Sequence, residues 1–315
     1  MFRRVVCHCH RFDVRYMPGI HINMDNAKGE SLEKPCVIVC NHQSLLDPML
    51  FMAWSDKIVI VANERSSLNP VVRIMFRWLN FYTIRETNFT AWKDSTLERD
   101  MDIFRDYIAK GYSIAIFPEG VRNPKSSILR CHKGPFYLAQ QLGVDILPVL
   151  IHGVNHLMPK GSFACYGGSI NMEVGERIVF GSEQWTHDYG EMTKIVHRQL
   201  SLGYDAMRRK YENAAYFSSY VIDRYRYKGT DVLSEVRRNI KACQKNPSFI
   251  DKEYTQKTVY ILNSGYGERA LLFALCKPDI QVLAFEEDEE KLALARYSAE
   301  GVVENLQYLP LSQYN

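Results

Sequence analysis

Short apolar runs alternate along this 315-residue chain with longer stretches of helical periodicity. The runs Cys36–Cys40, Lys57–Ala62 and Ser113–Phe117 have the length and residue types of buried strands. Residues 92–110 and 188–213 instead have the pattern of long helices. The alternation predicts an α/β sandwich in which helices surround a mixed sheet.

A polar octapeptide, Asn-His-Gln-Ser-Leu-Leu-Asp-Pro, follows the first of these predicted strands. The helix after it would open with proline at its first position. His42 and Asp47 are five residues apart, so only a turn could bring the carboxylate under the imidazole. Such a dyad would fix the ring tautomer and leave the other nitrogen to take a proton from a hydroxyl. The structural alternative is that Asp47 caps the helix and His42 is an ordinary strand-end histidine.

A second motif, Phe-Pro-Glu-Gly-Val-Arg, ends the predicted strand over Ser113–Phe117. Its proline ends the hydrogen-bonding ladder, and Gly120 lets the backbone turn where a ligand must come close. Arg122 adds a planar guanidinium that suits a phosphate. The motif therefore indicates a binding site rather than a plain turn.

Together the two motifs, Asn-His-x-Ser-x-x-Asp and Phe-Pro-Glu-Gly-x-Arg, resemble those of the glycerolipid acyltransferase family. Its best-known members are the 1-acyl-glycerol-3-phosphate acyltransferases. Residues 81–85 and 132–149 resemble two further blocks in the family's order, and the resemblance covers about residues 15–215. It implies an enzyme of phospholipid biosynthesis that moves a fatty acyl group from acyl-CoA or acyl-carrier protein. The acceptor would be the free hydroxyl of a lysophospholipid such as 1-acyl-glycerol-3-phosphate.

The resemblance also implies roles for individual residues. His42 would be the general base and Asp47 its orienting partner. The thioester is already activated, so neither an acyl-enzyme nor a further cofactor is required. The residues implied to hold or shape the site for the acceptor's phosphate are Arg85, Glu119, Gly120 and Arg122.

Two alternatives remain open. The same chemistry could acylate a hydroxyl of an amino-acid-derived lipid. The chain could instead be a non-catalytic lipid-binding partner of a membrane transporter, whose module would be encoded upstream. The dyad argues against this last alternative, because a site without chemistry needs neither His42 nor Asp47.

The net charge of +3 is concentrated in residues 1–215, which fits an anionic substrate or a membrane surface. No basic run or binding motif indicates nucleic acid. The sequence shows no signal peptide and no run of about 18 apolar residues that would predict a membrane span. We therefore expect a cytoplasmic protein associated peripherally with the inner face of the membrane. Residues 70–82 have the pattern of an interfacial helix, although a core-packed surface helix explains it equally well.

The eight cysteines show no paired spacing, and several lie in apolar segments, which indicates free thiols in a reducing compartment. The run Cys7-His8-Cys9-His10 lacks the loop spacing of metal ligands, so we expect no metal site.

The sequence after about residue 215 predicts a different domain organisation. We expect the acyltransferase-like domain over residues 1–215, a helical linker over 216–255 and a βαβ segment over 256–315. In that segment the predicted strand Thr258–Leu262 enters a glycine-containing loop, and the next predicted strand ends on Glu286.

This segment resembles the opening of a class I S-adenosylmethionine-dependent methyltransferase, a partial Rossmann-like unit. The resemblance implies cofactor-binding roles for Gly265, Gly267 and Glu286. Two positions depart from that family, since Ile261 replaces its acidic residue and Asn263 its first loop glycine. The chain also stops soon after a predicted third strand. We therefore expect a truncated or degenerate fold that does not use S-adenosylmethionine, or a small appendage that only packs on its neighbour.

Overall fold

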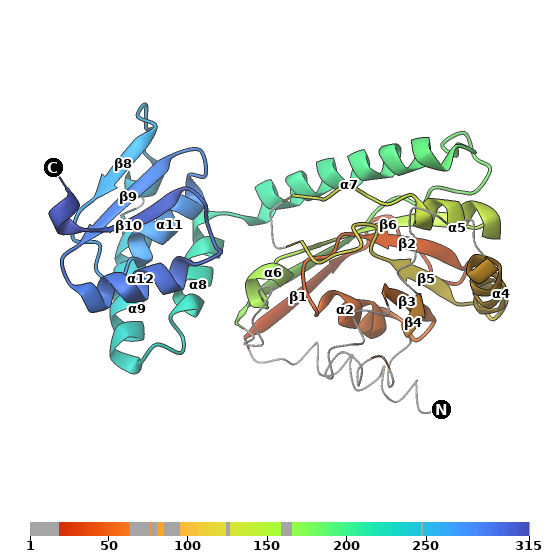
Figure 1. Cartoon of the computed structure of the whole chain (residues 1–315), viewed down its shortest axis with the longest axis horizontal. Helices are drawn as coiled ribbons and strands as arrows, with labels where there is room; N and C mark the ends of the chain where they lie inside the picture. The colour runs from red at the N-terminus through yellow and green to blue at the C-terminus, as the bar shows by residue number, and fades with distance from the viewer. Residues whose placement is uncertain are drawn as a thin grey trace. The chain divides into compact units, whose positions relative to one another are not determined.

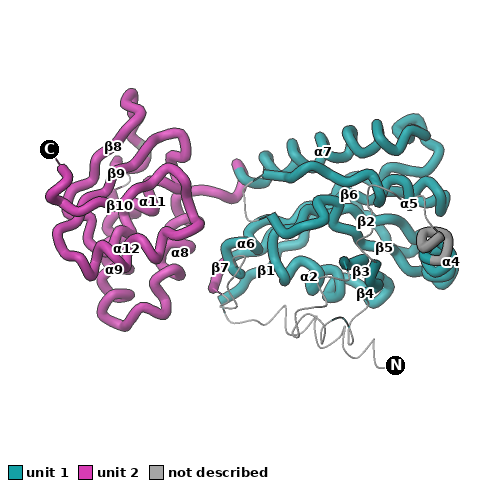
Figure 2. Tube along the Cα trace, in the orientation of Figure 1, with its two compact units in different colours: residues 1–165, 169–208 teal, residues 166–168, 209–315 magenta. Residues whose placement is uncertain are grey.

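The computed structural model describes residues 19–63, 76, 81–84, 95–123, 127–158, 166–246 and 248–314. The chain divides into two compact units (Figure 2). Unit 1 comprises residues 1–165 and 169–208, and unit 2 comprises residues 166–168 and 209–315. Unit 1 carries both polar motifs.

Unit 1 is built on a sheet in which the described strands have the order β1-β7-β6-β2-β5-β3-β4. The pairs from β6 to β4 are parallel, whereas β7 runs antiparallel to β6. The predicted α/β fold with a mixed sheet is therefore confirmed, and the structure adds that most of the pairs are parallel. The strands are β1 (Ile20–Asp25), β2 (Cys36–Cys40), β3 (Ile58–Asn63), β4 (Phe81–Ile84), β5 (Ser113–Ile116), β6 (Asp145–His152) and β7 (Gly168–Val174).

Helices cover both faces of this sheet. Figure 1 shows α7 along one face and α2 along the other. Because the central parallel strands β2, β5 and β6 are buried at every position, they are largely apolar rather than alternating in polarity. The described helices of unit 1 are α2 (Asp47–Trp54), α4 (Ser95–Ala109), α5 (Gly134–Leu142), α6 (Val154–Leu157) and α7 (Tyr189–Tyr211).

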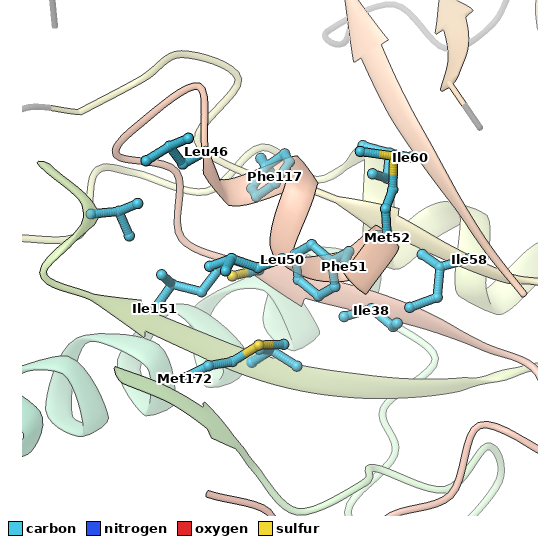
Figure 3. Packing of buried hydrophobic residues seen from close by; sticks show 14 of the residues in the cluster. Ile38, Leu46, Leu50, Phe51, Met52, Ile58, Ile60, Phe117, Ile151 and Met172 are labelled. Carbon is cyan, nitrogen blue, oxygen red and sulfur yellow. The ribbon is translucent and has the colours of Figure 1, made fainter. Parts of the chain in front are cut away.

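The core under α2 fixes that helix against the sheet. Leu50, Phe51 and Met52 of α2 are almost fully buried. They pack against side chains from β2 and β3 and against Phe117, which follows β5 (Figure 3). Each large apolar side chain buried in this way contributes about 1.5–3 kcal/mol. The members of this cluster from β2 and β3 are Cys36, Ile38, Cys40, Ile58 and Ile60.

A cluster of ion pairs lies at the end of the sheet where β6 begins. Oδ2 of Asp145 is 2.8 Å from the Lys34 ammonium and 3.4 Å from Nη1 of Arg177. The backbone N–H of Phe180 donates to the other oxygen at 2.9 Å. Arg177 also pairs with Glu30 at 2.9 Å. Burial raises the pKa of Asp145, but the contacts with Lys34, Phe180 and Arg177 outweigh it, so the pKa lies below its ordinary value.

Asp145→Asn is expected to lower the free energy of unfolding by about 1–3 kcal/mol at pH 7, because it removes a buried charge partner. The folded-state pKa is depressed, so this contribution is present above the unfolded pKa of about 3.9 and is lost as the pH falls through the folded value. Urea denaturation from pH 7 to pH 3 measures it. The exposed pair of Asp102 with Arg105 supplies the control, Asp102→Asn, with an effect below about 0.5 kcal/mol. A difference in unfolding free energy between the wild type and Asp145→Asn that does not change with pH would contradict this role.

Unit 2 contains a parallel sheet with the described order β10-β9-β8. Residues 216–255, predicted as a linker, include most of α8 and all of α9, and both helices bury apolar faces against α11. The domain boundaries at 215 and 255 stay predictions. The elements are α8 (Ala214–Arg224), α9 (Thr230–Lys245), α10 (Ser248–Asp251), β8 (Thr258–Ile261), α11 (Glu268–Cys276), β9 (Gln281–Glu286), α12 (Glu289–Ala299), β10 (Leu306–Pro310) and a 3-10 turn (Leu311–Gln313).

Within the described part of the chain, no helix combines the length and the apolarity needed to cross a bilayer. Of the predicted interfacial helix over residues 70–82, the structure describes only Phe76, Phe81 and Tyr82. Phe76 is helical, but Phe81 and Tyr82 belong to strand β4, so the prediction is wrong at this end. The cysteine and histidine run over residues 7–10 lies outside the described residues.

Candidate active site

The two polar motifs meet at one edge of the sheet. β2 and β5 are parallel neighbours, so their carboxyl ends lie together, and α/β sheets bind ligands at this edge. The backbone N–H of His42 donates to Oε1 of Glu119 at 2.9 Å. The rings of His42 and Phe117 are stacked, with centroids 4.3 Å apart. Segments that are 77 residues apart in the sequence therefore form one site.

His42 and Asp47 form a direct hydrogen bond. Asp47 is the first residue of α2, and its Oδ2 lies 2.8 Å from Nδ1 of His42. The Asp47 side chain is fully buried, whereas 17% of the His42 side chain stays exposed. An ionised carboxylate can only accept, so Nδ1 carries the proton and Nε2 of the neutral ring is left with its lone pair.

The same aspartate oxygen holds the turn that precedes the helix. It accepts the backbone N–H groups of Gln43 at 2.6 Å and Ser44 at 2.8 Å. Leu46, not Asp47, is the N-cap of α2, and no side chain caps the helix there. The helix-cap alternative is therefore wrong, because the carboxylate binds N–H groups ahead of the helix rather than inside its first turn.

Glu119 connects the His42 segment to the segment after β5. It is 3% exposed, and its second oxygen accepts the backbone N–H of Leu129 at 2.9 Å. Burial raises the pKa of this carboxyl, and the two N–H groups with the nearby His42 oppose that rise only in part. Both carboxylate oxygens thus accept backbone donors, and they tie the His42 segment to the segment after β5.

Gly120 and Arg122 follow Glu119 in the same segment. Gly120 has φ +69°, a backbone conformation that favours glycine, and a β-carbon there would make a tight contact of 3.2 Å with the ring of His132. Arg122 is half-buried. The next residue, Asn123, donates its backbone N–H to the carbonyl of His42 at 2.7 Å. Arg122 is therefore one residue away from a direct contact with the His42 segment.

Arg85 lies outside the described residues. β4 ends just before it, at Ile84, and runs parallel to β3, which is parallel to β5. The end of β4 is therefore on the same edge of the sheet as the two motifs.

Three further polar residues of the octapeptide were missed by sequence reasoning. Asn41, Gln43 and Ser44 are each at most 2% exposed. The Asn41 side chain donates to the carbonyl of Ile151 and accepts its N–H, both at 2.8 Å, so it continues the β2–β6 pairing beyond the strand. The hydroxyl of Ser44 donates to the carbonyl of Met158 at 3.1 Å. The sequence signal that could have identified them is that these polar residues directly follow an apolar strand.

In unit 2, the predicted cofactor residues Gly265 and Glu286 are in direct contact, and their cofactor-binding role stays a prediction. The Gly265 N–H donates to Oε2 of Glu286 at 2.6 Å, and Oε1 accepts two further backbone N–H groups. A β-carbon on Gly267 would lie 2.6 Å from Ala295 and 2.7 Å from Tyr308. The carboxylate of Glu286 is thus engaged by backbone donors, and Gly267 packs closely against Ala295 and Tyr308.

Comparison with known proteins gives one family and several relatives. Residues 21–152, which contain both motifs of unit 1, match the family model described as Acyltransferase. Human 1-acyl-sn-glycerol-3-phosphate acyltransferase beta is 30% identical over 166 residues, which cover 52% of this chain and 58% of that protein. The 1-acyl-sn-glycerol-3-phosphate acyltransferase of Pseudomonas aeruginosa is 28% identical over 144 residues, which cover 45% and 54%. The matches thus span little more than half of each relative.

A solved structure shares the fold. The crystal structure of the 1-acyl-sn-glycerophosphate acyltransferase PlsC from Thermotoga maritima superposes with a TM-score of 0.51 at 23% sequence identity. The superposition covers 65% of this chain and 81% of that chain.

Proposed function

We propose that this protein transfers a fatty acyl group from a thioester to a lysophospholipid hydroxyl, because residues 21–152 match the family model described as Acyltransferase. The donor would be acyl-CoA or acyl-carrier protein, and the acceptor 1-acyl-glycerol-3-phosphate, in keeping with the names of two relatives. The observation that carries the proposal is the 2.8 Å contact between Nδ1 of His42 and the buried carboxylate of Asp47.

The chemistry follows from that contact. The acceptor hydroxyl gives its proton to Nε2 of His42, and its oxygen attacks the thioester carbonyl carbon. The carbon–sulfur bond then breaks and the thiolate leaves, taking up the proton from the imidazolium. Asp47 holds the ring in the productive tautomer and stabilises the positive charge that develops on it. The acyl group passes directly from the sulfur to the acceptor oxygen, so no acyl-enzyme is formed.

The phosphate of the acceptor would bind at the second motif. The positive φ of Gly120 allows the backbone to approach a ligand closely, and Arg122 brings a guanidinium to the same segment. Arg85 would join them from the end of β4. Glu119 would keep this segment in register with His42 through its two backbone contacts.

Arg122→Ala is expected to raise the KM for 1-acyl-glycerol-3-phosphate about 10- to 100-fold with little change in kcat. A charge-assisted contact contributes about 1.5–3 kcal/mol, and the phosphate is bound equally in the ground and transition states. Steady-state kinetics with varied acceptor measure it, with Arg198→Ala on the exposed side of α7 as the control. A fall in kcat at constant KM would contradict the role.

The proposed function is tested by mixing the protein with labelled acyl-CoA or acyl-carrier protein and lysophosphatidic acid in vesicles. Formation of phosphatidic acid supports the proposal. Acylation of an amino-acid-derived lipid alone would change the acceptor but keep the chemistry. Binding to the vesicles without any thioester consumption would reject the enzyme. We also propose that the reaction takes place at the cytoplasmic membrane surface, because the acceptor and the product are both lipids.

A further inference from the structure

Helix α7 contacts the segment that carries His42 through a tyrosine. The hydroxyl of Tyr204 accepts a hydrogen bond of 2.5 Å from Nε2 of Gln43, a residue 161 positions away. Tyr204 is 1% exposed and Gln43 is 2% exposed. A hydrogen bond between two buried side chains favours one arrangement strongly, because breaking it leaves both groups out of reach of water.

The close packing of α7 explains why this tyrosine reaches the site. Gly203 is its neighbour, and a β-carbon there would lie 2.6 Å from Leu150 of β6. The helix therefore lies directly on β6, with Tyr204 at the edge where that strand ends. The ring of His152, the last residue of β6, has its centroid 6.0 Å from that of Tyr204. β2, which leads to His42, pairs with β6 at this edge.

Gln43 is held at two points. Its side chain binds Tyr204, and its backbone N–H donates to Oδ2 of Asp47 at 2.6 Å. The same Oδ2 orients the ring of His42. A shift of Gln43 therefore changes the position of the carboxylate oxygen relative to the imidazole. These contacts form a continuous path from Tyr204 through Gln43 and Asp47 to His42.

The other polar residues of the octapeptide have different partners. Asn41 binds the backbone of Ile151, and the hydroxyl of Ser44 binds the carbonyl of Met158. A substitution cannot remove those backbone atoms. The side chain of Gln43 instead binds the side chain of Tyr204. A Tyr204→Phe substitution therefore removes this contact by removing only the hydroxyl oxygen.

We propose that Tyr204 is a positioning residue for acyl transfer, which acts on His42 through Gln43 and Asp47. This inference rests on the proposed function of the dyad. Without the hydroxyl of Tyr204, the side-chain amide of Gln43 loses its hydrogen-bond acceptor. The turn that carries His42 can then adopt more than one conformation. The reaction slows, whereas binding of the acceptor's phosphate does not change, because the proposed phosphate contacts come from the segment after β5.

Tyr204→Phe is expected to lower kcat about 10-fold and to leave the acceptor KM within about twofold, which corresponds to the loss of one buried hydrogen bond. The matched control is Tyr225→Phe in unit 2, whose buried hydroxyl donates to the carbonyl of Tyr266 at 2.6 Å. It is expected to change neither constant. An unchanged kcat in Tyr204→Phe, or a higher KM at constant kcat, would overturn the proposal.

A double-mutant cycle tests the route through Gln43. Gln43→Met keeps the size of the side chain and removes its amide. If Tyr204 acts through Gln43, the double variant is no slower than Gln43→Met alone. Losses that multiply would show that the two residues act independently, and they would overturn the proposed route.

A measurement that needs no activity completes the test. Amide hydrogen exchange of Gln43 and Ser44 is expected to be at least about 10-fold faster in Tyr204→Phe, while the amides of β3 keep their protection. Unchanged exchange at both residues would overturn the proposal. If the wild-type protein shows no acyl transfer, only the proposed function is rejected. Amide hydrogen exchange would still decide whether Tyr204 positions the segment of Gln43 and Ser44.

Discussion

His42→Ala is expected to lower the kcat of acyl transfer at least about 100-fold. General-base catalysis typically contributes 10²- to 10⁴-fold, and the acceptor hydroxyl would lose the group that takes its proton. A 100-fold loss corresponds to about 2.7 kcal/mol in the activation free energy. The acceptor KM is expected to change little, because the phosphate is proposed to bind at Gly120 and Arg122.

The measurement compares initial rates at saturating acceptor with the urea midpoint of each protein. His42 stacks on Phe117, so a small loss of stability is expected, and circular dichroism at the assay temperature checks that the variant is folded. His187→Ala, at an exposed position before α7, is the matched control. A folded His42→Ala protein with near-normal turnover would show that the imidazole is not the base.

Asp47→Asn is expected to reduce kcat by about 10²- to 10⁴-fold with only a modest loss of stability. An amide oxygen in the place of Oδ2 can still accept from His42, Gln43 and Ser44. However, it is neutral, so it no longer stabilises the imidazolium that forms when the hydroxyl is deprotonated. The effect on rate should therefore far exceed the effect on folding.

Asp47→Ala separates the two roles. It leaves two backbone N–H groups without their acceptor, and each costs about 1–3 kcal/mol, so this variant should be both inactive and less stable. Kinetics and urea denaturation of the two variants measure the difference. The control is Asp188→Asn, since Asp188 also accepts two backbone N–H groups, at the start of α7. An Asn variant within about tenfold of wild-type kcat would refute the orienting role of Asp47.

Much of unit 1 could be predicted because its signals are local. The strand over Cys36–Cys40 is apolar at every position since both of its faces are covered. Pro48 near the start of α2 marked the beginning of that helix. The strand that precedes Glu119 ends at Ile116, one residue earlier than the predicted run, since Phe117 already belongs to the turn.

The anchoring of the site could not be predicted, because it depends on distant partners. The partner of Gln43 is on α7, and the partner of Asn41 is on β6, 110 residues along the chain. No spacing rule in the sequence identifies such pairs. The amphipathic pattern of α9 likewise indicates that one face is buried but not that it packs against α11, which is why residues 216–255 were predicted as a linker.

The sequence by itself determined the strands β2, β3 and β5, the helices α4 and α7, and the residues of the two polar motifs, because each depends on neighbours a few positions apart. Tertiary structure decided that the motifs share one edge, that the Asp47 carboxylate turns back to the His42 ring, and that Tyr204 holds the segment between them. These contacts form only when the parallel pairing of β2 with β5 and β6 places their ends side by side. The physical reason is that hydrogen bonds select partners by distance in space, which the order of residues does not specify.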